Sequence, residues 1–125
     1  MVNTSGTGTF WLSLPWPPSV NHYWRRLGNR TLVSAEGRRY RQAAGAAVRL
    51  QVRTLSCTCR LGVQIVVHPP DRRERDLDNL LKAPLDALQY AGVYARDSQI
   101  DDLHIKRGSI EPGGELLVGI RELGG

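Results

Sequence analysis

Asp76 and Asp78 are separated by a single residue, and their side-chain type and spacing are the most suited to chemistry in this chain. In an extended backbone, residues i and i+2 point the same way, so at the end of a strand both carboxylates would face one side. Two carboxylates that close require a cation or a shared proton. Carboxylate oxygens suit Mg²⁺ or Mn²⁺ and are poor ligands for soft metals. The pair therefore indicates a site for a hard divalent metal.

Three arginines stand directly before this pair. They are Arg72, Arg73 and Arg75, interrupted only by Glu74. The guanidinium fork matches the oxygens of a phosphate. Carboxylates for a hard metal beside arginines for phosphate suggest metal-assisted cleavage of a phosphodiester.

A second interpretation of the two aspartates stays open at this point. One could cap a helix while the other pairs with a nearby arginine, since capping aspartates are common. An Asp-x-Asp pattern alone does not decide between a metal site and a structural pair. Lys82, four residues after Asp78, and Asp97, after the next predicted helix, favour the metal site.

Three stretches of the sequence resemble one known family. DRRERDLDNLLKAPLDAL (residues 71–88) resembles the signature of the RusA family of Holliday junction resolvases. LPWPPSVNHYWRR (residues 14–26), LVSAEGRRYR (residues 32–41) and the spacing to Asp97 extend the resemblance. Together they cover nearly the whole chain in the right order.

The resemblance implies roles for individual residues. Asp76, Asp78 and Asp97 correspond to the family's catalytic, metal-binding acids, with Mg²⁺ as the expected ion and Mn²⁺ as a substitute. Lys82 matches the catalytic lysine, whereas Asn79 and Asp86 are expected to support the site or the fold. Glu74 departs from the more uniformly basic family pattern. The residues expected to contact DNA are Arg72, Arg73, Arg75, Arg25, Arg26 and Lys82.

The implied activity is hydrolysis of DNA phosphodiesters at a four-way junction by paired, symmetric nicks. Two equivalent nicks call for two equivalent sites, so we expect a C₂ homodimer. The resemblance implies no organic cofactor. One alternative is a non-catalytic protein that binds branched DNA, although the acids would then repel DNA without a metal. Another is a metal-dependent phosphatase or ribonuclease.

Length and composition set the frame for these roles. A chain of 125 residues with 41% hydrophobic residues fits a single domain over residues 1–125, with residues 1–8 expected to be disordered. The formal net charge of +5 is compatible with nucleic-acid binding. We expect a cytoplasmic protein, because neither a signal peptide nor a membrane-spanning run is apparent. Cys57 and Cys59 are too close for an easy bridge and are expected to be reduced.

The order of predicted elements is β-α-β-α-β-β, which indicates an α+β domain with helices packed on one mixed sheet. Strands are predicted over residues 10–14, 61–68, 100–106 and 116–123, and residues 27–31 are predicted to form a turn or loop. A first helix should run over residues 35–54 with Ser34 as its N-cap. A second should run from residue 78 or 79 to residue 91, with Gly92 after its end. Pro84 would kink this helix or delay the start of its regular part.

Helical spacing predicts which side chains face the core. In the first helix these are Tyr40, Ala43, Ala44, Ala47 and Leu50, as core or dimer interface. In the second they are Leu81, Leu85 and Leu88, beside Pro84. The spacing also places Asp78, Lys82 and Asp86 on one face, with Lys82 over the carboxylates.

Overall fold

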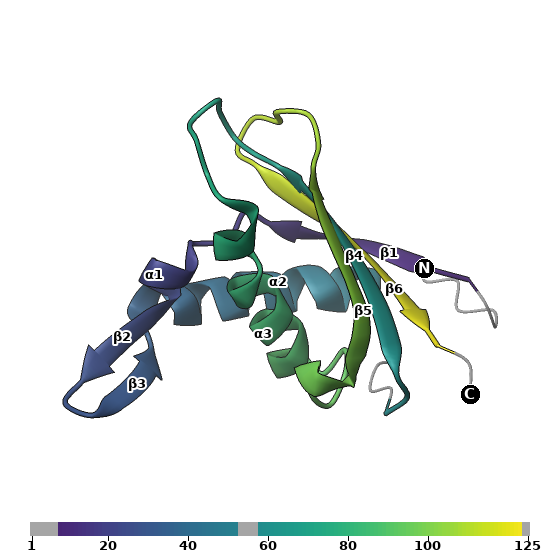
Figure 1. The fold of residues 1–125 in the computed structure, drawn as a ribbon, viewed down its shortest axis with the longest axis horizontal. Helices are drawn as coiled ribbons and strands as arrows, with labels where there is room; N and C mark the ends of the chain where they lie inside the picture. Colours follow the sequence, from purple (N-terminus) through teal and green to yellow (C-terminus); the bar gives the residue numbers. More distant parts are fainter. Residues whose placement is uncertain (1–7, 53–57, 124–125) are drawn as a thin grey trace.

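The computed structural model describes residues 8–52 and 58–123 of the chain, which form one mixed sheet covered by helices on one face (Figure 1). The sheet has the strand order β1-β6-β4-β5, with bounds Phe10–Pro15, Glu115–Glu122, Leu61–His68 and Ile100–Arg107. β4 pairs in parallel with β5 and antiparallel with β6, and β6 pairs antiparallel with β1. The predicted α+β class with a mixed sheet is confirmed.

The core lies between this sheet and two helices, α2 (Ala35–Gln51) and α3 (Lys82–Tyr90). Alternate residues of the central strand β4, namely Leu61, Val63, Ile65 and Val67, are buried on the helix side. This is the period of two that a half-covered strand requires. α3 lies in the connection between the parallel strands β4 and β5, which a parallel pair needs.

The helix-facing stripe of α2 differs in part from the predicted one. Its buried residues are Gly37, Tyr40, Ala44, Gly45 and Val48, whereas Ala43 is exposed and Leu50 is 89% exposed. The predicted stripe was therefore centred too far towards the solvent-facing side of the helix. The helix ends at Gln51, with an extended cap at Val52, and residues 53–57 lie outside the described ranges.

The start and end of α3 follow from two residues that the sequence marked. A 3₁₀ turn, η1 (Leu77–Leu80), comes first, so Pro84 falls in the first turn of α3, where its missing N–H needs no partner. At the other end Gly92 has a φ of 86°, and the N–H groups of Gly92 and Val93 donate to Gln89 and Leu88. This Schellman arrangement ends the helix as predicted.

The buried stripe of α3 also needs a correction. Ala83, Pro84, Ala87 and Leu88 are buried, while Leu81 and Leu85 are only half-buried against the core. The reason is the delayed start of the regular helix, which changes the phase of the stripe relative to a helix that begins at residue 78.

A short helix and the two strands of a hairpin were missed. A short helix, α1 (Val20–Tyr23), is followed by a hairpin of β2 (Trp24–Leu27) and β3 (Arg30–Val33), which forms a separate two-stranded sheet. Gly28, with a φ of 62°, lies in the turn. A Gly-Asn pair between short extended runs is a known hairpin signal, and only its turn had been recognised.

α2 packs against α1 and the hairpin through a glycine. A Cβ on Gly37 would lie 2.6 Å from the carbonyl oxygen of Tyr23 and 2.7 Å from Cγ1 of Val33. We expect Gly37→Ala to lower the free energy of unfolding by about 1–3 kcal/mol, because overpacking outweighs the better helix propensity of alanine. The matched control is Gly45→Ala in the same helix, where the nearest atom is the mobile Arg49 guanidinium at 3.4 Å. Urea unfolding in which both variants are equally stable would contradict this packing.

Some predictions fall at the edges of the described residues. We predicted that residues 1–8 are disordered, but of these the structure describes only Gly8, which is exposed. The predicted state of Cys57 also concerns a residue outside the described ranges. Cys59 is disulfide-bonded and is not the free thiol that we expected. Among the helices of residues 8–52 and 58–123, none is long and apolar enough to cross a membrane.

Candidate active site

Asp76 and Asp78 do not lie at a strand end, contrary to the premise of the sequence argument. β4 ends at His68, and a loop leads from it to Asp76, which has an extended backbone and precedes η1. Asp78 already belongs to that 3₁₀ turn. The carbonyl of Asp76 accepts from the N–H of Asn79 at 3.2 Å, so backbone bonding fixes the turn. Both aspartates are exposed, which leaves their carboxylates accessible to a ligand.

Lys82, at the start of α3, lies close to Asp97, which follows the end of that helix. The Lys82 Nζ lies 3.9 Å from Oδ2 of Asp97, and both side chains are 42% exposed. Lys82 opens α3, and Asp97 opens the 3₁₀ turn η2 (Asp97–Gln99) after it. The same ammonium lies 5.6 Å from the ring centroid of Trp24. Lys82 is therefore held between a carboxylate and an aromatic face, both of which attract its ammonium group.

The turn that carries Asp97 is fixed by two buried or half-buried glutamines. The Asp97 N–H donates to Oε1 of Gln89 at 3.0 Å. The Gln99 side chain, which is buried, accepts from the N–H groups of Ala95 and Arg96, both at 2.9 Å, and donates to the Cys59 carbonyl at 2.7 Å. Asp97 thus sits on a rigid support in an otherwise irregular connection.

The three aspartates supply the oxygen donors that Mg²⁺ prefers. Within residues 8–52 and 58–123, however, no group of three His, Cys, Asp or Glu side chains is arranged to hold a metal ion. The donor chemistry fits a hard metal, whereas the carboxylates are not drawn together into a closed set of ligands. The Asp97 carboxylate pairs instead with the ammonium of Lys82.

The basic loop before Asp76 is stabilised from within. Asp71 Oδ1 accepts from the N–H of Arg73 at 2.9 Å and pairs with the Arg75 guanidinium at 2.9 Å. These two contacts lower the pKa of the Asp71 carboxyl. Arg75 also donates to the Arg73 carbonyl and lies 5.4 Å from the ring centroid of Trp16, with only 18% of its side chain exposed. Arg75 is consequently committed to the shape of the loop.

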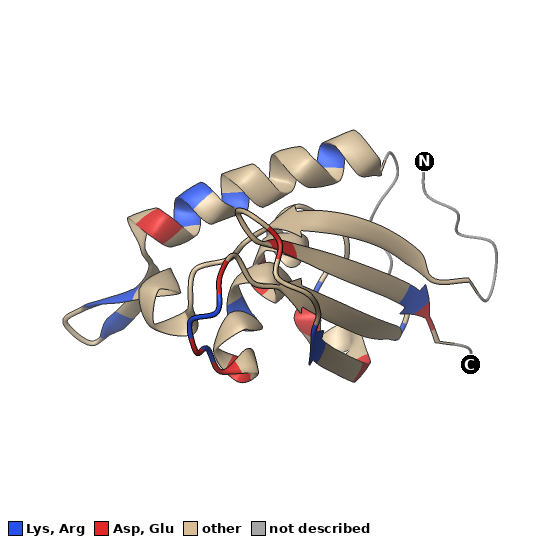
Figure 2. Cartoon of the chain, turned by 90° about the horizontal axis from the view of Figure 1, so that it is seen from above, with Lys and Arg blue, Asp and Glu red and all other residues tan. Residues whose placement is uncertain are grey.

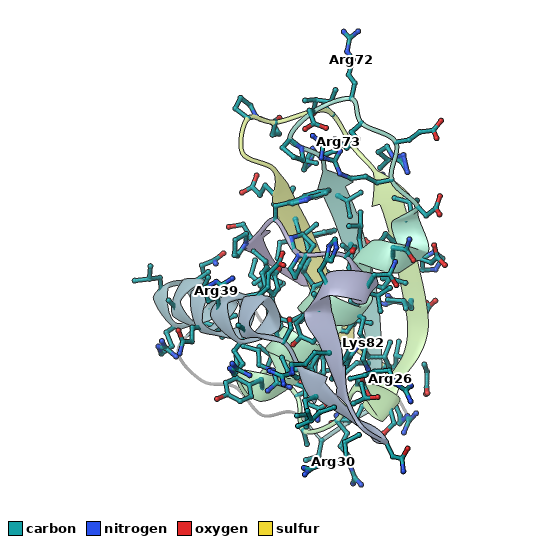
Figure 3. The ribbon with its side chains drawn as sticks, turned by 90° about the vertical axis from the view of Figure 1, so that its left-hand side faces the viewer. Arg26, Arg30, Arg39, Arg72, Arg73 and Lys82 are labelled. Carbon is teal, nitrogen blue, oxygen red and sulfur yellow. The ribbon has the colours of Figure 1, made fainter. Side chains whose placement is uncertain are left out.

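The other basic candidates are exposed and lie in two places. Arg72 and Arg73 stand at the outer end of the loop, with Arg72 pointing away from the body (Figure 3). Arg25 and Arg26 lie on the hairpin. Figure 2 shows basic residues on both the loop and the hairpin, with acidic residues interspersed among the basic residues of the loop. The structure thus provides two exposed basic elements rather than one continuous run.

A surface cleft of about 580 Å³ borders Asp76. Asp76 and Asn79 line one side of it, and His22 and Glu36, from α1 and the start of α2, also line it. The cleft therefore lies between the Pro-rich segment at residues 14–26 and the signature stretch at residues 71–88. Neither residue spacing nor periodicity had predicted that these two stretches would meet.

Asp86 does not share the surroundings of Lys82, although the two are one helical turn apart. Its Oδ2 accepts from the Tyr23 hydroxyl and from the Arg41 guanidinium, with Arg41 nitrogens at 2.8 and 2.9 Å. Burial raises the pKa of the Tyr23 hydroxyl, and the bond to Asp86 adds to that shift. Asp86 therefore joins α1, α2 and α3, which supports the structural role proposed for it.

Trp24, Gln89 and Gln99 were missed as residues that position the site. Trp24 lies within a resemblance stretch, but a contact with Lys82 across 58 positions has no local signature. The glutamines act through long-range bonds to backbone groups, which periodicity does not reveal. These are tertiary contacts that only the assembled fold discloses.

Comparison with known proteins defines the class to which this arrangement belongs. Residues 15–119 match the family described as Endodeoxyribonuclease RusA. That match spans most of the chain and includes the loop, the candidate acids and Lys82. The chain belongs to the RusA family, and the prediction of a nuclease is confirmed.

Individual relatives are similar along almost their full length. The chain is 42% identical over 110 residues to the crossover junction endodeoxyribonuclease of Enterobacteria phage HK97, covering 88% of this chain and 92% of the relative. It is 40% identical over 116 residues to the RusA enzymes of Escherichia coli K12 and Enterobacteria phage 82, covering 93% of this chain and 97% of each relative.

Proposed function

We propose that this protein is a Mg²⁺-dependent, structure-selective endodeoxyribonuclease that resolves four-way DNA junctions. The relatives described above carry the name crossover junction endodeoxyribonuclease, which supports this substrate. The observation that carries the proposal is the contact of Lys82 with Asp97, next to the turn that bears Asp76 and Asp78. It gathers the cation and one acid of the proposed machinery around the start of α3.

Asp76, Asp78 and Asp97 would hold the metal ion, with Mn²⁺ as a substitute for Mg²⁺. When bound, such an ion lowers the pKa of a water molecule and stabilises charge on the attacked phosphate. The exposed positions of Asp76 and Asp78 allow them to reach an ion that arrives with the DNA. Asn79, in the same turn and lining the cleft, supports the placement of Asp76.

Lys82 would contribute the positive charge that the reaction needs beside the acids. Its ammonium can donate to a phosphate oxygen and offset negative charge as the phosphodiester is attacked. The Trp24 ring and the Asp97 carboxylate restrict where that ammonium lies before DNA binds. This placement lowers the cost of ordering a long, flexible side chain.

The exposed arginines would hold the DNA backbone, because phosphate contacts fix the register of a protein on DNA. Arg72 and Arg73 are free to do so at the end of the loop, whereas Arg75 maintains the loop itself. A four-way junction requires two nicks, so we propose that the enzyme acts as a C₂ homodimer with one site in each subunit. We expect it to work in the cytoplasm.

The main alternative is a protein that binds branched DNA without cutting it. The open arrangement of the carboxylates is the observation that favours this alternative. Against it, exposed acids beside a DNA-binding loop would repel the substrate unless a cation neutralised them.

The test compares a synthetic four-way junction, a linear duplex of the same sequence and a single-stranded RNA as substrates in Mg²⁺. We expect rapid cleavage of the junction and little or no cleavage of the other two. Equal cleavage of junction and duplex would remove the structure selectivity, and preferred cleavage of RNA would favour the ribonuclease alternative. Tight binding of the junction without cleavage would favour the binding protein.

Binding should depend steeply on salt. Each phosphate contact adds about 0.9 to the slope of log K against log salt concentration, so the double variant Arg72→Ala, Arg73→Ala should lose about 2 from that slope. The control is Arg49→Ala, an exposed arginine in the last part of α2, which should leave the slope unchanged. Fluorescence anisotropy with a labelled junction at several salt concentrations measures both. An unchanged slope in the double variant would exclude these two phosphate contacts.

A further inference from the structure

The β2–β3 hairpin projects from the side of the molecule and adds nothing to the main sheet (Figure 1). Residues 25–31 are all exposed, and residues 24–33 contain three arginines, Arg25, Arg26 and Arg30, with no acidic residue. An isolated two-stranded hairpin has little stability of its own in water. A projecting, purely basic hairpin is better suited to binding a polyanion than to supporting a core.

The hairpin is firmly attached at its base. The Ser34 N–H donates to the Tyr23 carbonyl at 2.9 Å, and the Val33 carbonyl accepts from Arg38 at 3.0 Å. The Trp24 ring stands edge-on to Tyr23, with ring centroids 5.1 Å apart, and also lies 5.6 Å from the Lys82 ammonium. The first residue of the hairpin is therefore a neighbour of the candidate catalytic lysine.

Strand alternation separates the two arginines of β2. Trp24 and Arg26 point to one side of the hairpin, and Arg25 points to the other. Because the Trp24 ring faces Lys82, Arg26 lies on the side of the hairpin that faces the candidate site. Arg30 pairs with Leu27 and so lies nearer the turn of the hairpin than Arg26 does.

We propose that Arg26, and not Arg25, binds a phosphate of the DNA strand that is cut. This inference rests on the proposed function and names the contact that extends its site. A residue at i+2 lies about 7 Å farther along a strand, so Arg26 lies beyond Trp24 on the same side of the hairpin. The phosphate bound by Arg26 is therefore expected to be near the one beside Lys82 but distinct from it.

The contact between Arg26 and the phosphate can be tested by removing the arginine charge and the phosphate charge, separately and in combination. Junctions are prepared with a single uncharged methylphosphonate at each of the positions one to three nucleotides on either side of the cleavage position. Binding is measured in EDTA, with the intact protein, Arg26→Ala and Arg25→Ala. We expect the intact protein and Arg25→Ala to bind more weakly when one particular phosphate is neutralised. Arg26→Ala should bind the unmodified junction more weakly, with a salt slope lower by about 0.9, and should not respond to neutralisation of that phosphate.

Arg25→Ala is a matched control because it removes the same charge from the same exposed strand. The proposal is overturned if Arg26→Ala stays as sensitive as the intact protein at every position, or if both variants behave alike. Arg26→Gln serves as a second variant of similar length. Failure of the proposed function gives a different result, namely no junction cleavage by the intact protein in Mg²⁺, whatever the phosphate measurements show.

Discussion

Asp78→Asn should reduce the rate of junction cleavage by at least about 10²–10³-fold while junction binding survives. Asparagine keeps the shape of the side chain but is a neutral and much weaker ligand for Mg²⁺. Because Asp78 is exposed and lies in a turn held by backbone bonds, the substitution should not disturb the fold. Loss of a negative charge near the DNA should leave affinity equal or higher. Single-turnover cleavage in Mg²⁺ and binding in EDTA measure the two effects separately.

Asp101→Asn is the control for Asp78→Asn. Asp101 is also exposed, and it pairs with Arg60 at the start of β5, outside the signature stretch. This variant should cleave at close to the unmodified rate. Full activity of Asp78→Asn would show that Asp78 has no role in the reaction and would leave the alternative of a helix-capping or charge-pairing residue.

Asp86→Ala should give the largest loss of stability among the substitutions in the signature stretch. The side chains of Asp86 and Arg41 are 17% and 23% exposed, and the Tyr23 side chain that shares the carboxylate is fully buried. Removing Asp86 leaves a buried hydroxyl and a half-buried guanidinium without their acceptor. Because the pair keeps some contact with solvent, we expect a loss of about 2–4 kcal/mol in the free energy of unfolding, less than for a fully buried pair. Urea unfolding measures this change.

Two control variants are needed to interpret the stability of Asp86→Ala. Asp86→Asn retains an acceptor oxygen and should lose less stability than Asp86→Ala. Asp101→Ala breaks an ion pair whose side chains are 47% and 55% exposed, and should cost at most about 1 kcal/mol. If Asp86→Ala proved no more destabilising than Asp101→Ala, the proposed link between α1, α2 and α3 would be wrong.

The parts of the fold that were predicted correctly depend on local physics. Ser34 was expected to cap α2, and its hydroxyl accepts from the Gly37 N–H at 2.9 Å. Gly92 ends α3 and Pro84 marks its start, because each has a backbone requirement that acts over a few residues. Strand β4 shows its alternation directly in the sequence. These features need no knowledge of the rest of the chain.

The parts that were not predicted depend on contacts between distant segments. Asp76 was placed at a strand end because its Asp-x-Asp spacing suits a strand, yet the strand stops at His68 and a loop intervenes. The contact of Lys82 with Trp24 and the bond of Asp86 with Tyr23 join segments roughly half the chain apart. The family resemblance named the acids and Lys82 as a group, whereas spacing alone misjudged the surroundings of Asp86.

The most direct measurement maps the nicks in a synthetic four-way junction exposed to the unmodified protein in Mg²⁺ and in EDTA. Each of the four strands carries a label in turn, so that every cut is assigned to a strand and a position. The account predicts paired nicks at symmetric positions on two opposing strands in Mg²⁺, and none in EDTA. Cleavage that persists in EDTA, or tight binding of the junction with no cleavage in Mg²⁺ or Mn²⁺, would contradict a metal-dependent site built from Asp76, Asp78, Asp97 and Lys82.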